Sequence, residues 1–428
     1  MLDLHFILEN IDEVRQNTAD RNVQVNLDQL VSLDEQRRSL IVESEGIRQR
    51  QNQIAKSMKS KMSQEERQAL IEEGRSLKSK VAELETTLDS VKEQLHDLQV
   101  QIPNLTHPDV PHGDGDDDHL ALRHWGTPRE FDFDAKDHVD LGNELGLIDW
   151  ESGAKVTGSK FYYLKNDAVW LELALFQYAL SILREEGFTL ATTPDLARQE
   201  ILEGIGFNPR GSATQIYSVE NTDLSLIATA EITLGGMHFD EILEESELPI
   251  LLAGVSHCFR TEAGSPGRVS RGLYRVHQFS KVEMFAFTTP EASNQMLERF
   301  NGIQERIFQG LELPYRVVDC CRGDLGAQAY RKYDIEAWMP GRSEGGSYGE
   351  VTSASNCTDY QARRMKIRFR REGVRKPLFL HTLNGTAVAT SRAMLAIMEN
   401  FQQKDGTIII PEALRPFMLG IEKIEPSK

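Results

Sequence analysis

The residues best suited to chemistry stand together between residues 258 and 285, in the stretch CFRTEAGSPGRVSRGLYRVHQFSKVEMF. Arg260 and Glu262 lie two apart on what reads as an incoming strand, so both side chains are expected on one face of a sheet. A cation and a carboxylate presented together on a sheet floor suit a substrate that carries a phosphate and a hydrogen-bond donor.

The elements that position this pair are predicted from the apolar pattern around them. Alternating apolar residues in 273–276 and 282–287 indicate strands. The intervening turn is polar and is punctuated by Gly264, Gly267 and Gly272. The stretch therefore predicts a strand, a glycine-rich turn and a second strand.

Further chemical groups flank this stretch. Thr229 and Glu231 lie two apart in LIATAEI (226–232), which predicts one face of an extended segment. Glu350 and Ser353 offer hard oxygen ligands of the kind that Mg²⁺ prefers. Arg392 offers a planar guanidinium, whose fork of donors matches the oxygens of a phosphate.

The stretch 258–287 closely resembles motif 2 of class II aminoacyl-tRNA synthetases, in the version found in seryl-tRNA synthetases. LIATAEI resembles the TxE motif of that family, and LNGTAVATSRAMLAIMEN (383–400) resembles motif 3. A helix expected from the cap Asn166 to about Glu186, followed by FTLATTPDL with Pro194, resembles motif 1, which builds the dimer interface in this family. The resemblance extends over nearly the whole chain.

The resemblance implies a serine–tRNA ligase that joins L-serine to ATP as seryl-adenylate and transfers it to the 3′ end of tRNA(Ser) and, where present, tRNA(Sec). Arg260 and Arg392 are the implied catalytic residues, and Glu350 and Ser353 hold Mg²⁺ with the ATP. The implied serine-binding residues are Thr229, Ala230, Glu231, Arg260, Glu283 and Thr386, and the implied ATP-binding residues are Arg260, Thr261, Glu262, Val276, Phe279, Glu350, Val351, Thr352, Ser353 and Arg392.

Two heptad patterns precede these motifs. Leu33, Leu40, Ile47 and Ile54 are each seven apart, and a second helix repeats apolar residues at alternating spacings of three and four from Leu70 to Leu98. Two such segments of matching length, joined near residues 59–64, predict an antiparallel helical hairpin. About thirty residues per helix give a rod on the order of 45 Å long.

Positive charge gathers toward the tip of this hairpin, although the whole chain carries a formal net charge of −18. Such a chain excludes indiscriminate nucleic-acid binding, so an RNA site must be a local basic patch. Contact with a tRNA phosphate backbone is one interpretation, and a solvated or oligomerising coiled coil is the other. Residues 46–64 contain no acidic residue and five cations: Arg48, Arg50, Lys56, Lys59 and Lys61.

The chain is expected to form three parts. Residues 1–103 form the tRNA-binding hairpin arm, and residues 104–120, rich in proline and acidic residues, form a linker. Residues 121–428 form a class II catalytic core of the α+β class, with a mixed, mainly antiparallel sheet flanked by helices. The family implies a homodimer.

Composition indicates the cellular compartment and bears on whether the protein binds zinc. Four cysteines without metal-ligand spacing indicate reduced thiols and no zinc. The chain has no apolar run of 18 residues and no recognisable leader, so we expect a cytoplasmic protein without membrane contact.

Two other functions fit parts of the pattern. One is a class II homologue that activates an amino acid for a carrier protein, which the long arm disfavours. The other is a dimeric RNA-binding or scaffold protein that has lost catalysis. The intact set Arg260, Glu262, Glu283, Glu350 and Arg392 disfavours that interpretation.

Overall fold

The structure is a computed structural model that describes residues 1–207, 216–262 and 272–426. It divides the chain into two compact units, Met1–Pro103 and Asn104–Lys428. The predicted turn glycines Gly264 and Gly267 lie outside the described residues.

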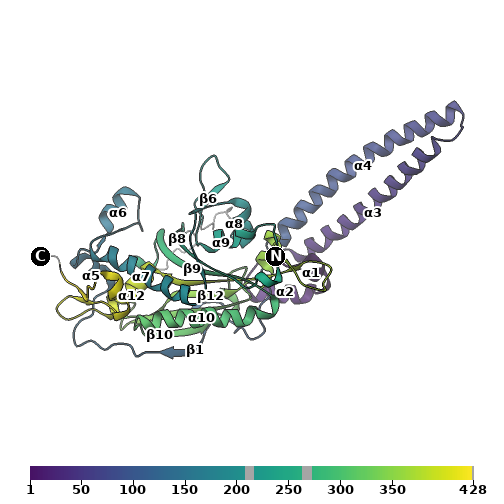
Figure 1. The fold of residues 1–428 in the computed structure, drawn as a ribbon. Helices are drawn as coiled ribbons and strands as arrows, with labels where there is room; N and C mark the ends of the chain where they lie inside the picture. Colours follow the sequence, from purple (N-terminus) through teal and green to yellow (C-terminus); the bar gives the residue numbers. More distant parts are fainter. Residues whose placement is uncertain (208–215, 263–271, 427–428) are drawn as a thin grey trace. The chain divides into compact units, whose positions relative to one another are not determined.

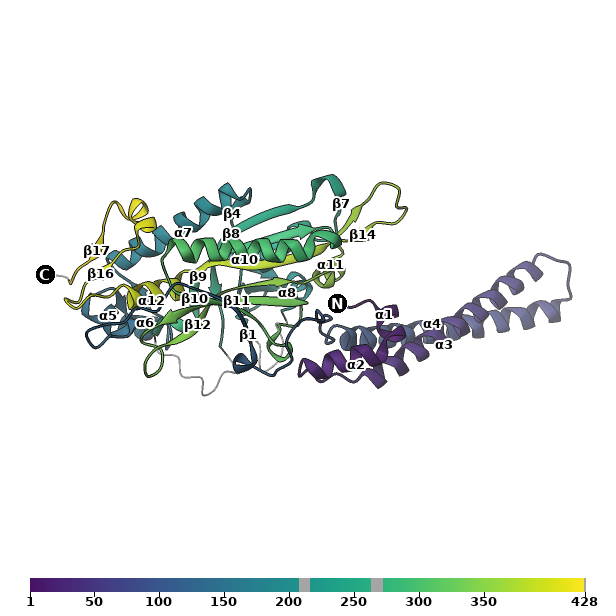
Figure 2. The same ribbon diagram turned by 90° about the horizontal axis from the view of Figure 1, so that it is seen from below.

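The first unit is a long helical hairpin preceded by two short helices. Its long helices lie side by side (Figures 1 and 2), and each begins at a capped residue. Asn26 accepts a hydrogen bond from Gln29 N, and Ser63 forms a capping box with Glu66. The helices are α1 (Leu4–Glu9), α2 (Ile11–Asp20), α3 (Leu27–Ser57) and α4 (Gln64–Gln99).

The heptad pattern of the hairpin is confirmed. Leu33 and Ile54 of α3 are buried, as are Val91 and Leu95 of α4. The polar residue Ser44, which interrupts the second seam of α3, is also buried. Periodicity therefore predicted the contact face even where one of its positions is polar.

The second unit is built on a mainly antiparallel sheet, as predicted. Among the described residues, eight strands form it in the order β1-β10-β11-β12-β15-β9-β8-β4. Strands β4 and β8 run parallel, and the other neighbours run antiparallel. The bounds are β1 (Leu120–Trp125), β4 (Thr189–Thr192), β8 (Ile250–Phe259), β9 (Gln278–Thr288), β10 (Tyr315–Asp319), β11 (Arg331–Met339), β12 (Ser347–Asn356) and β15 (His381–Ala389).

Smaller strand pairs and helices surround this sheet. The short strands are β2 (Ile148–Asp149), β3 (Tyr163–Leu164), β5 (Leu196–Arg198), β6 (Leu224–Leu226), β7 (Ile242–Glu244), β13 (Arg368–Arg370), β14 (Leu378–Phe379), β16 (Ile408–Ile409) and β17 (Lys423–Ile424). The helices are α5 (His138–Glu144), α6 (Trp150–Val156), α7 (Asp167–Glu185), α8 (Gln199–Ile205), α9 (Glu231–Gly235), α10 (Ser293–Gly310), α11 (Tyr360–Met365) and α12 (Thr390–Asn400).

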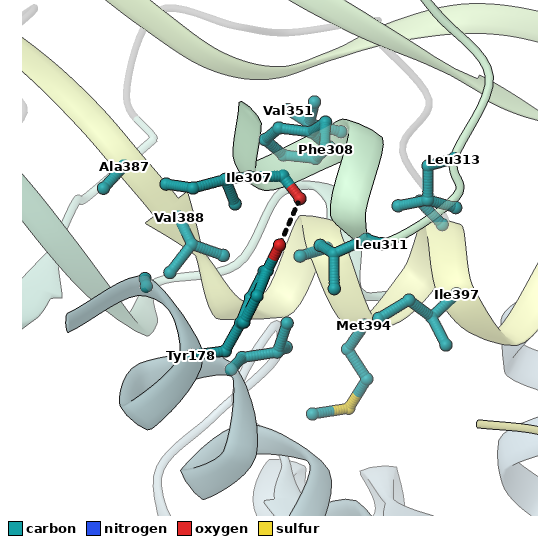
Figure 3. Packing of buried hydrophobic residues seen from close by; sticks show 14 of the residues in the cluster. Tyr178, Ile307, Phe308, Leu311, Leu313, Val351, Ala387, Val388, Met394 and Ile397 are labelled. Atoms are coloured by element: carbon teal, nitrogen blue, oxygen red, sulfur yellow. Dashed lines mark hydrogen bonds between the residues drawn. The ribbon is translucent and has the colours of Figure 1, made fainter. Parts of the chain in front are cut away.

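Helices α7 and α10 cover one face of the sheet and form the main core with it (Figure 2). The Tyr178 hydroxyl of α7 donates to Ile307 O of α10 (3.3 Å) within this apolar cluster (Figure 3). On β9, Val282 and Met284 point into the core, so Lys281 and Glu283, which alternate with them, face the opposite side of the sheet. That opposite face carries the site.

The motif-1 helix has the predicted limits. Asn166 is the N-cap position, although its side-chain amide donates to Gly146 O (2.9 Å). Gly187 follows the helix with φ +83°, a conformation that costs glycine little and ends the helix.

Two local predictions are wrong. Residues 273–276 do not form a strand. Gly272–Tyr274 forms a 3₁₀ turn, η4, because the buried imidazole of His138 accepts the Leu273 N–H that a neighbouring strand would otherwise accept. The segment 226–232 is not extended as predicted either: strand β6 ends at Leu226, and Thr229 Oγ1 accepts the Glu231 N–H (3.2 Å), where helix α9 begins. Strand β9 does confirm the strand predicted at 282–287.

Within residues 1–207, 216–262 and 272–426, no helix has the length and apolar character needed to cross a membrane.

Candidate functional site

A cleft of about 1030 Å³ opens on the sheet face opposite α7 and α10. Its floor comes from β9, β11, β12 and β15, and its rim from the segments that follow β8 and precede β9. The predicted residues that line it are Thr229, Glu231, Arg260, Glu262, Val276, Phe279, Glu283, Glu350, Val351, Thr352, Ser353, Thr386 and Arg392. Ala230 packs in a neighbouring apolar cluster, and neither it nor Thr261 lines the cleft.

Arg260 and Glu262 both reach the cleft, but not by the predicted route. Strand β8 ends at Phe259, and Glu262 has φ +53°, so strand alternation does not relate the two side chains. Arg260 is held by its backbone N–H, which donates to His277 O (2.9 Å), and its guanidinium lies 5.2 Å from the centre of the Phe279 ring. Glu262 forms an ion pair with Arg275.

A buried ionic centre occupies one end of the cleft. Lys281 Nζ lies 2.5 Å from Glu283 Oε2 and donates to Thr229 Oγ1 (2.8 Å). Thr386, which is opposite Glu283 in the β15–β9 ladder, donates to the same carboxylate oxygen (3.0 Å). Because all four side chains are buried, this set fixes a carboxylate and two hydroxyls in a small pocket.

Glu231 lies beside this centre and is also buried. Gln361 Nε2 (2.7 Å) and Asn384 Nδ2 (2.9 Å) donate to its Oε1. Burial, followed by the negative charge of Glu283, raises the pKa of Glu231 to about 7. Two carboxylates that share one pocket are well suited to a ligand with a positive charge.

Glu350 and Arg392 form the other end of the cleft. Arg392 Nη1 lies 3.1 Å from Glu350 Oε1. Partial burial disfavours the charged form of Glu350, but the charges of Arg392, Lys332 and Arg260 together outweigh it and hold the pKa at about 2. The β11–β12 register shifts between Ile335 and Glu336, so Glu350 and Ser353, three residues apart, both face the cleft.

Comparison with known proteins assigns both units. Residues 1–106 match the family described as the seryl-tRNA synthetase N-terminal domain, and residues 216–401 match the tRNA synthetase class II core domain (G, H, P, S and T). The chain is 58% identical to a serine–tRNA ligase of Rubrobacter xylanophilus, with 100% of both chains covered. It is 53% identical to that of Treponema denticola, over 99% of this chain and 100% of the relative.

A solved structure agrees with these relatives. The seryl-tRNA synthetase of Pyrococcus horikoshii, complexed with ATP, superposes with a TM-score of 0.90 at 40% identity and covers 100% of both chains. The chain belongs to the seryl-tRNA synthetase family. The resemblance to this family, the fold class and the serine–tRNA ligase activity expected from the sequence are thereby confirmed.

The arm cations named from the sequence are not equivalent in this synthetase. Arg50 forms a bidentate pair with Glu73 of α4 (2.7 and 3.0 Å), and Arg48 pairs with Glu85. These two arginines therefore tie the hairpin helices together. Lys56, Lys59 and Lys61 are exposed near the tip.

Several positively charged side chains that line the cleft were not predicted from the sequence. Lys281 had a signal: it lies directly before the predicted strand 282–287 and two residues before Glu283, so an extension of the strand by one residue puts both side chains on one face. Arg342 had none, since it follows β11 in a loop and reaches the cleft only by packing over the Tyr274 ring (4.3 Å). The cations that line the cleft in addition to the predicted ones are Arg275, Lys281, Arg316, Lys332 and Arg342.

One cluster resembles a metal site in residue type. His119, Cys320 and Asp324 place their ligand atoms within 4.8 Å of one another. Lys332 Nζ already lies 3.0 Å from Asp324 Oδ2, and burial raises the pKa of the Cys320 thiol well above its usual range. A neighbouring ammonium and a protonated thiol both oppose a divalent cation, so the cluster reads as an ion-pair network.

We expect Glu231→Gln to change the pH dependence of stability in the ligand-free protein. The folded-state pKa of Glu231 is raised from 4.5 to about 7, so its protonated form stabilises the fold fully below pH 4.5 and loses that contribution as pH rises through 7. Glutamine keeps the acceptor for Gln361 and Asn384 and does not titrate. From pH 5 to pH 8, the wild type should lose on the order of 3 kcal/mol relative to the variant.

Urea unfolding of both proteins at the two pH values measures this difference. Parallel changes in the wild type and the variant would show that Glu231 does not titrate in this range.

Proposed function

We propose that this synthetase activates L-serine with ATP in the cleft and transfers the seryl group to tRNA(Ser) in the cytoplasm. The supporting observation is that Arg260 lines the same cleft as the buried carboxylates Glu231 and Glu283 and the Glu350–Arg392 pair. We propose that the first group of residues binds an ammonium and a hydroxyl, that the Glu350–Arg392 end binds phosphates, and that Arg260 acts between them. That is where an amino-acid carboxylate would meet the α-phosphate.

Activation joins two anionic groups, so the barrier is electrostatic. A carboxylate oxygen of serine attacks the α-phosphorus of ATP, a P–O bond forms, and the bond to the leaving pyrophosphate breaks. Arg260 neutralises charge on the reacting groups, and Arg392 binds the triphosphate tail. The protein supplies position and charge and no nucleophile of its own.

The buried ionic centre is the proposed serine pocket. Glu231 and Glu283 bind the ammonium and hydroxyl of serine, and Thr229 and Thr386 complete the hydrogen bonds. Alanine lacks the hydroxyl and would leave these buried partners unpaired, and a larger side chain exceeds the available volume. Desolvated partners thus give the pocket its selectivity.

The adenine site is proposed on the Phe279 ring, with Val276 beneath the nucleotide and Glu262 receiving the exocyclic amine. The Arg260 guanidinium lies over the Phe279 ring, a contact that supports a stacking role for this ring.

The residues present fit a Mg²⁺ ion beside the triphosphate. Glu350 is ionised at neutral pH, Ser353 faces the same part of the cleft, and Asp334, opposite Ser353 in the ladder, has a buried Oδ1 without a hydrogen-bond partner among the described residues. Bound there, Mg²⁺ would neutralise phosphate charge. Glu350 and Ser353 are the proposed ligands.

Transfer then requires a ribose hydroxyl at the tRNA 3′ end, which attacks the carbonyl carbon of the seryl-adenylate and releases AMP. We propose that residues 1–103 bind the tRNA through exposed cations near the hairpin tip, with Lys56, Lys59 and Lys61 as phosphate contacts. Because Arg48 and Arg50 are paired within the hairpin, their role in tRNA contact is secondary.

A homodimer is proposed through the motif-1 helix α7. Val169, Trp170 and Leu173 are 41%, 39% and 42% exposed and form an apolar strip on the outer side of this helix. An exposed strip containing tryptophan is typical of a protein interface.

We expect Arg260→Ala to abolish serine-dependent exchange between ATP and pyrophosphate, by about 100-fold or more, because a charge-stabilising contact is lost in the transition state. Arg123→Ala is the matched control: Arg123 lies on β1, forms an ion pair with Glu305 of α10, and its loss should leave exchange unchanged. Near-normal exchange in the Arg260 variant would refute its proposed role.

Removal of residues 33–98 should leave exchange largely intact and abolish charging of tRNA, since the cleft lies wholly within the second unit. A finer variant, with Lys56, Lys59 and Lys61 changed to alanine, should raise KM for tRNA about tenfold and weaken its salt dependence. Undiminished charging by the deletion would contradict the arm's role. Charging is measured as acid-precipitable labelled serine on total tRNA.

Trp170→Asp should give a monomer, because a charge in a desolvated apolar contact has no partner. Sedimentation equilibrium measures the mass, and Met237→Asp, at a side chain 55% exposed, is the control. A variant that remains dimeric would exclude α7 as the interface.

A further inference from the structure

A buried histidine–carboxylate pair lies behind the phosphate end of the cleft. His138, the first residue of α5, and Glu399, near the end of α12, are both buried. The two side chains meet at 2.7 Å between His138 Nδ1 and Glu399 Oε1. Neither residue lines the cleft, so neither is expected to touch a substrate.

The hydrogen bonds define which nitrogen of His138 carries the proton. Nε2 accepts the backbone N–H of Leu273 (3.0 Å), so that nitrogen is unprotonated and the proton is on Nδ1, directed at Glu399. The imidazole therefore connects the carboxylate to the backbone of η4, the turn that leads into β9.

Glu399 holds a second backbone segment. Its Oε2 accepts the N–H of Gly341 (2.8 Å), and its Oε1 also accepts the N–H of His138 (3.1 Å). Glu399 and Arg392 lie seven residues apart on α12, which places them on one side of the helix and about 10 Å apart along its axis. The helix that delivers Arg392 is thus fixed at its far end by the same carboxylate.

The two segments held in this way carry the groups that surround Arg392. Leu273 precedes Tyr274, whose carbonyl accepts from Arg392 Nε (3.3 Å) and whose ring centre lies 4.6 Å from the Arg392 guanidinium carbon. Gly341 precedes Arg342, whose guanidinium lies 4.3 Å from that ring centre. Tyr274 is therefore in contact with both arginines, and both lie over its ring.

The packing leaves little freedom at either attachment. A Cβ at Gly272, where φ is +71°, would lie 2.0 Å from His138 Nε2, and a Cβ at Gly341 would lie 2.9 Å from Glu399 Oε1. Both backbone segments approach the pair as closely as glycine permits. The pair therefore determines where these turns run.

We propose that His138 and Glu399 are positioning residues for ATP: they fix, through Leu273 N–H and Gly341 N–H, the segments that place Tyr274 and Arg342 against Arg392. The inference rests on the proposed function, in which Arg392 binds the triphosphate. It predicts that loss of the pair weakens ATP binding selectively, because the serine pocket on β9 and β15 has its own supports in Lys281 and Gln361.

The experiment is steady-state pyrophosphate exchange with His138→Ala, His138→Gln and Glu399→Gln, each with KM measured separately for ATP and serine. We expect His138→Ala and Glu399→Gln to raise KM for ATP about tenfold or more and to leave KM for serine within about twofold. His138→Gln should restore much of the loss, since its amide oxygen can accept the Leu273 N–H. Glu399→Gln keeps the side-chain volume and so tests the proposal even if His138→Ala fails to fold.

A purely structural role gives a different result. It would lower the amount of active enzyme, so kcat would fall while both KM values stayed at the wild-type level, and this outcome would overturn the proposal. An equal rise in both KM values would also overturn it. Wild-type enzyme without serine-dependent exchange would instead refute the proposed function.

Discussion

Strand β9 has to satisfy two environments at once, and the rest of the catalytic unit is arranged around that constraint. Its side chains alternate, so Val282 and Met284 must be covered by α7 and α10, while Lys281 and Glu283 must face the other way. Covering one face with helices leaves the other as a floor of fixed polar groups. The cleft is therefore a consequence of how the core is packed.

Burial then determines the chemistry of that floor. Lys281, Glu283 and Glu231 are charged or titratable groups held away from water, and each is stable only because another group compensates it. Arg392 keeps Glu350 ionised, whereas Glu231, next to Glu283, has a raised pKa. These two carboxylates of one cleft thus differ in pKa, because Arg392 forms an ion pair with Glu350 whereas Glu231 is fully buried beside the negative charge of Glu283. Such a site is already organised for charged substrates before they bind.

Residues that do not line the cleft also contribute to its geometry. The His138–Glu399 pair holds backbone groups of two separate turns, and those turns present Tyr274 and Arg342 to Arg392. Backbone N–H groups that are bound by a buried side chain cannot shift without losing a partner in a dry environment. The placement of Tyr274 and Arg342 beside Arg392 therefore depends on hydrogen bonds made by residues that do not line the cleft.

Most of the elements, and most of the residues that line the cleft, were predictable from the amino-acid sequence. Heptad spacing predicted the hairpin, alternation predicted β9, and the motif residues gave the family, because these signals are local and repeat with the period of the element. Tertiary structure alone decided the conformation at 229–231 and 273–276, the pairing of Arg48 and Arg50 across the hairpin, and the arrival of Arg342 in the cleft. Each of these depends on a partner distant in the chain or on a side chain that competes for a backbone hydrogen bond, and no local pattern records such a partner.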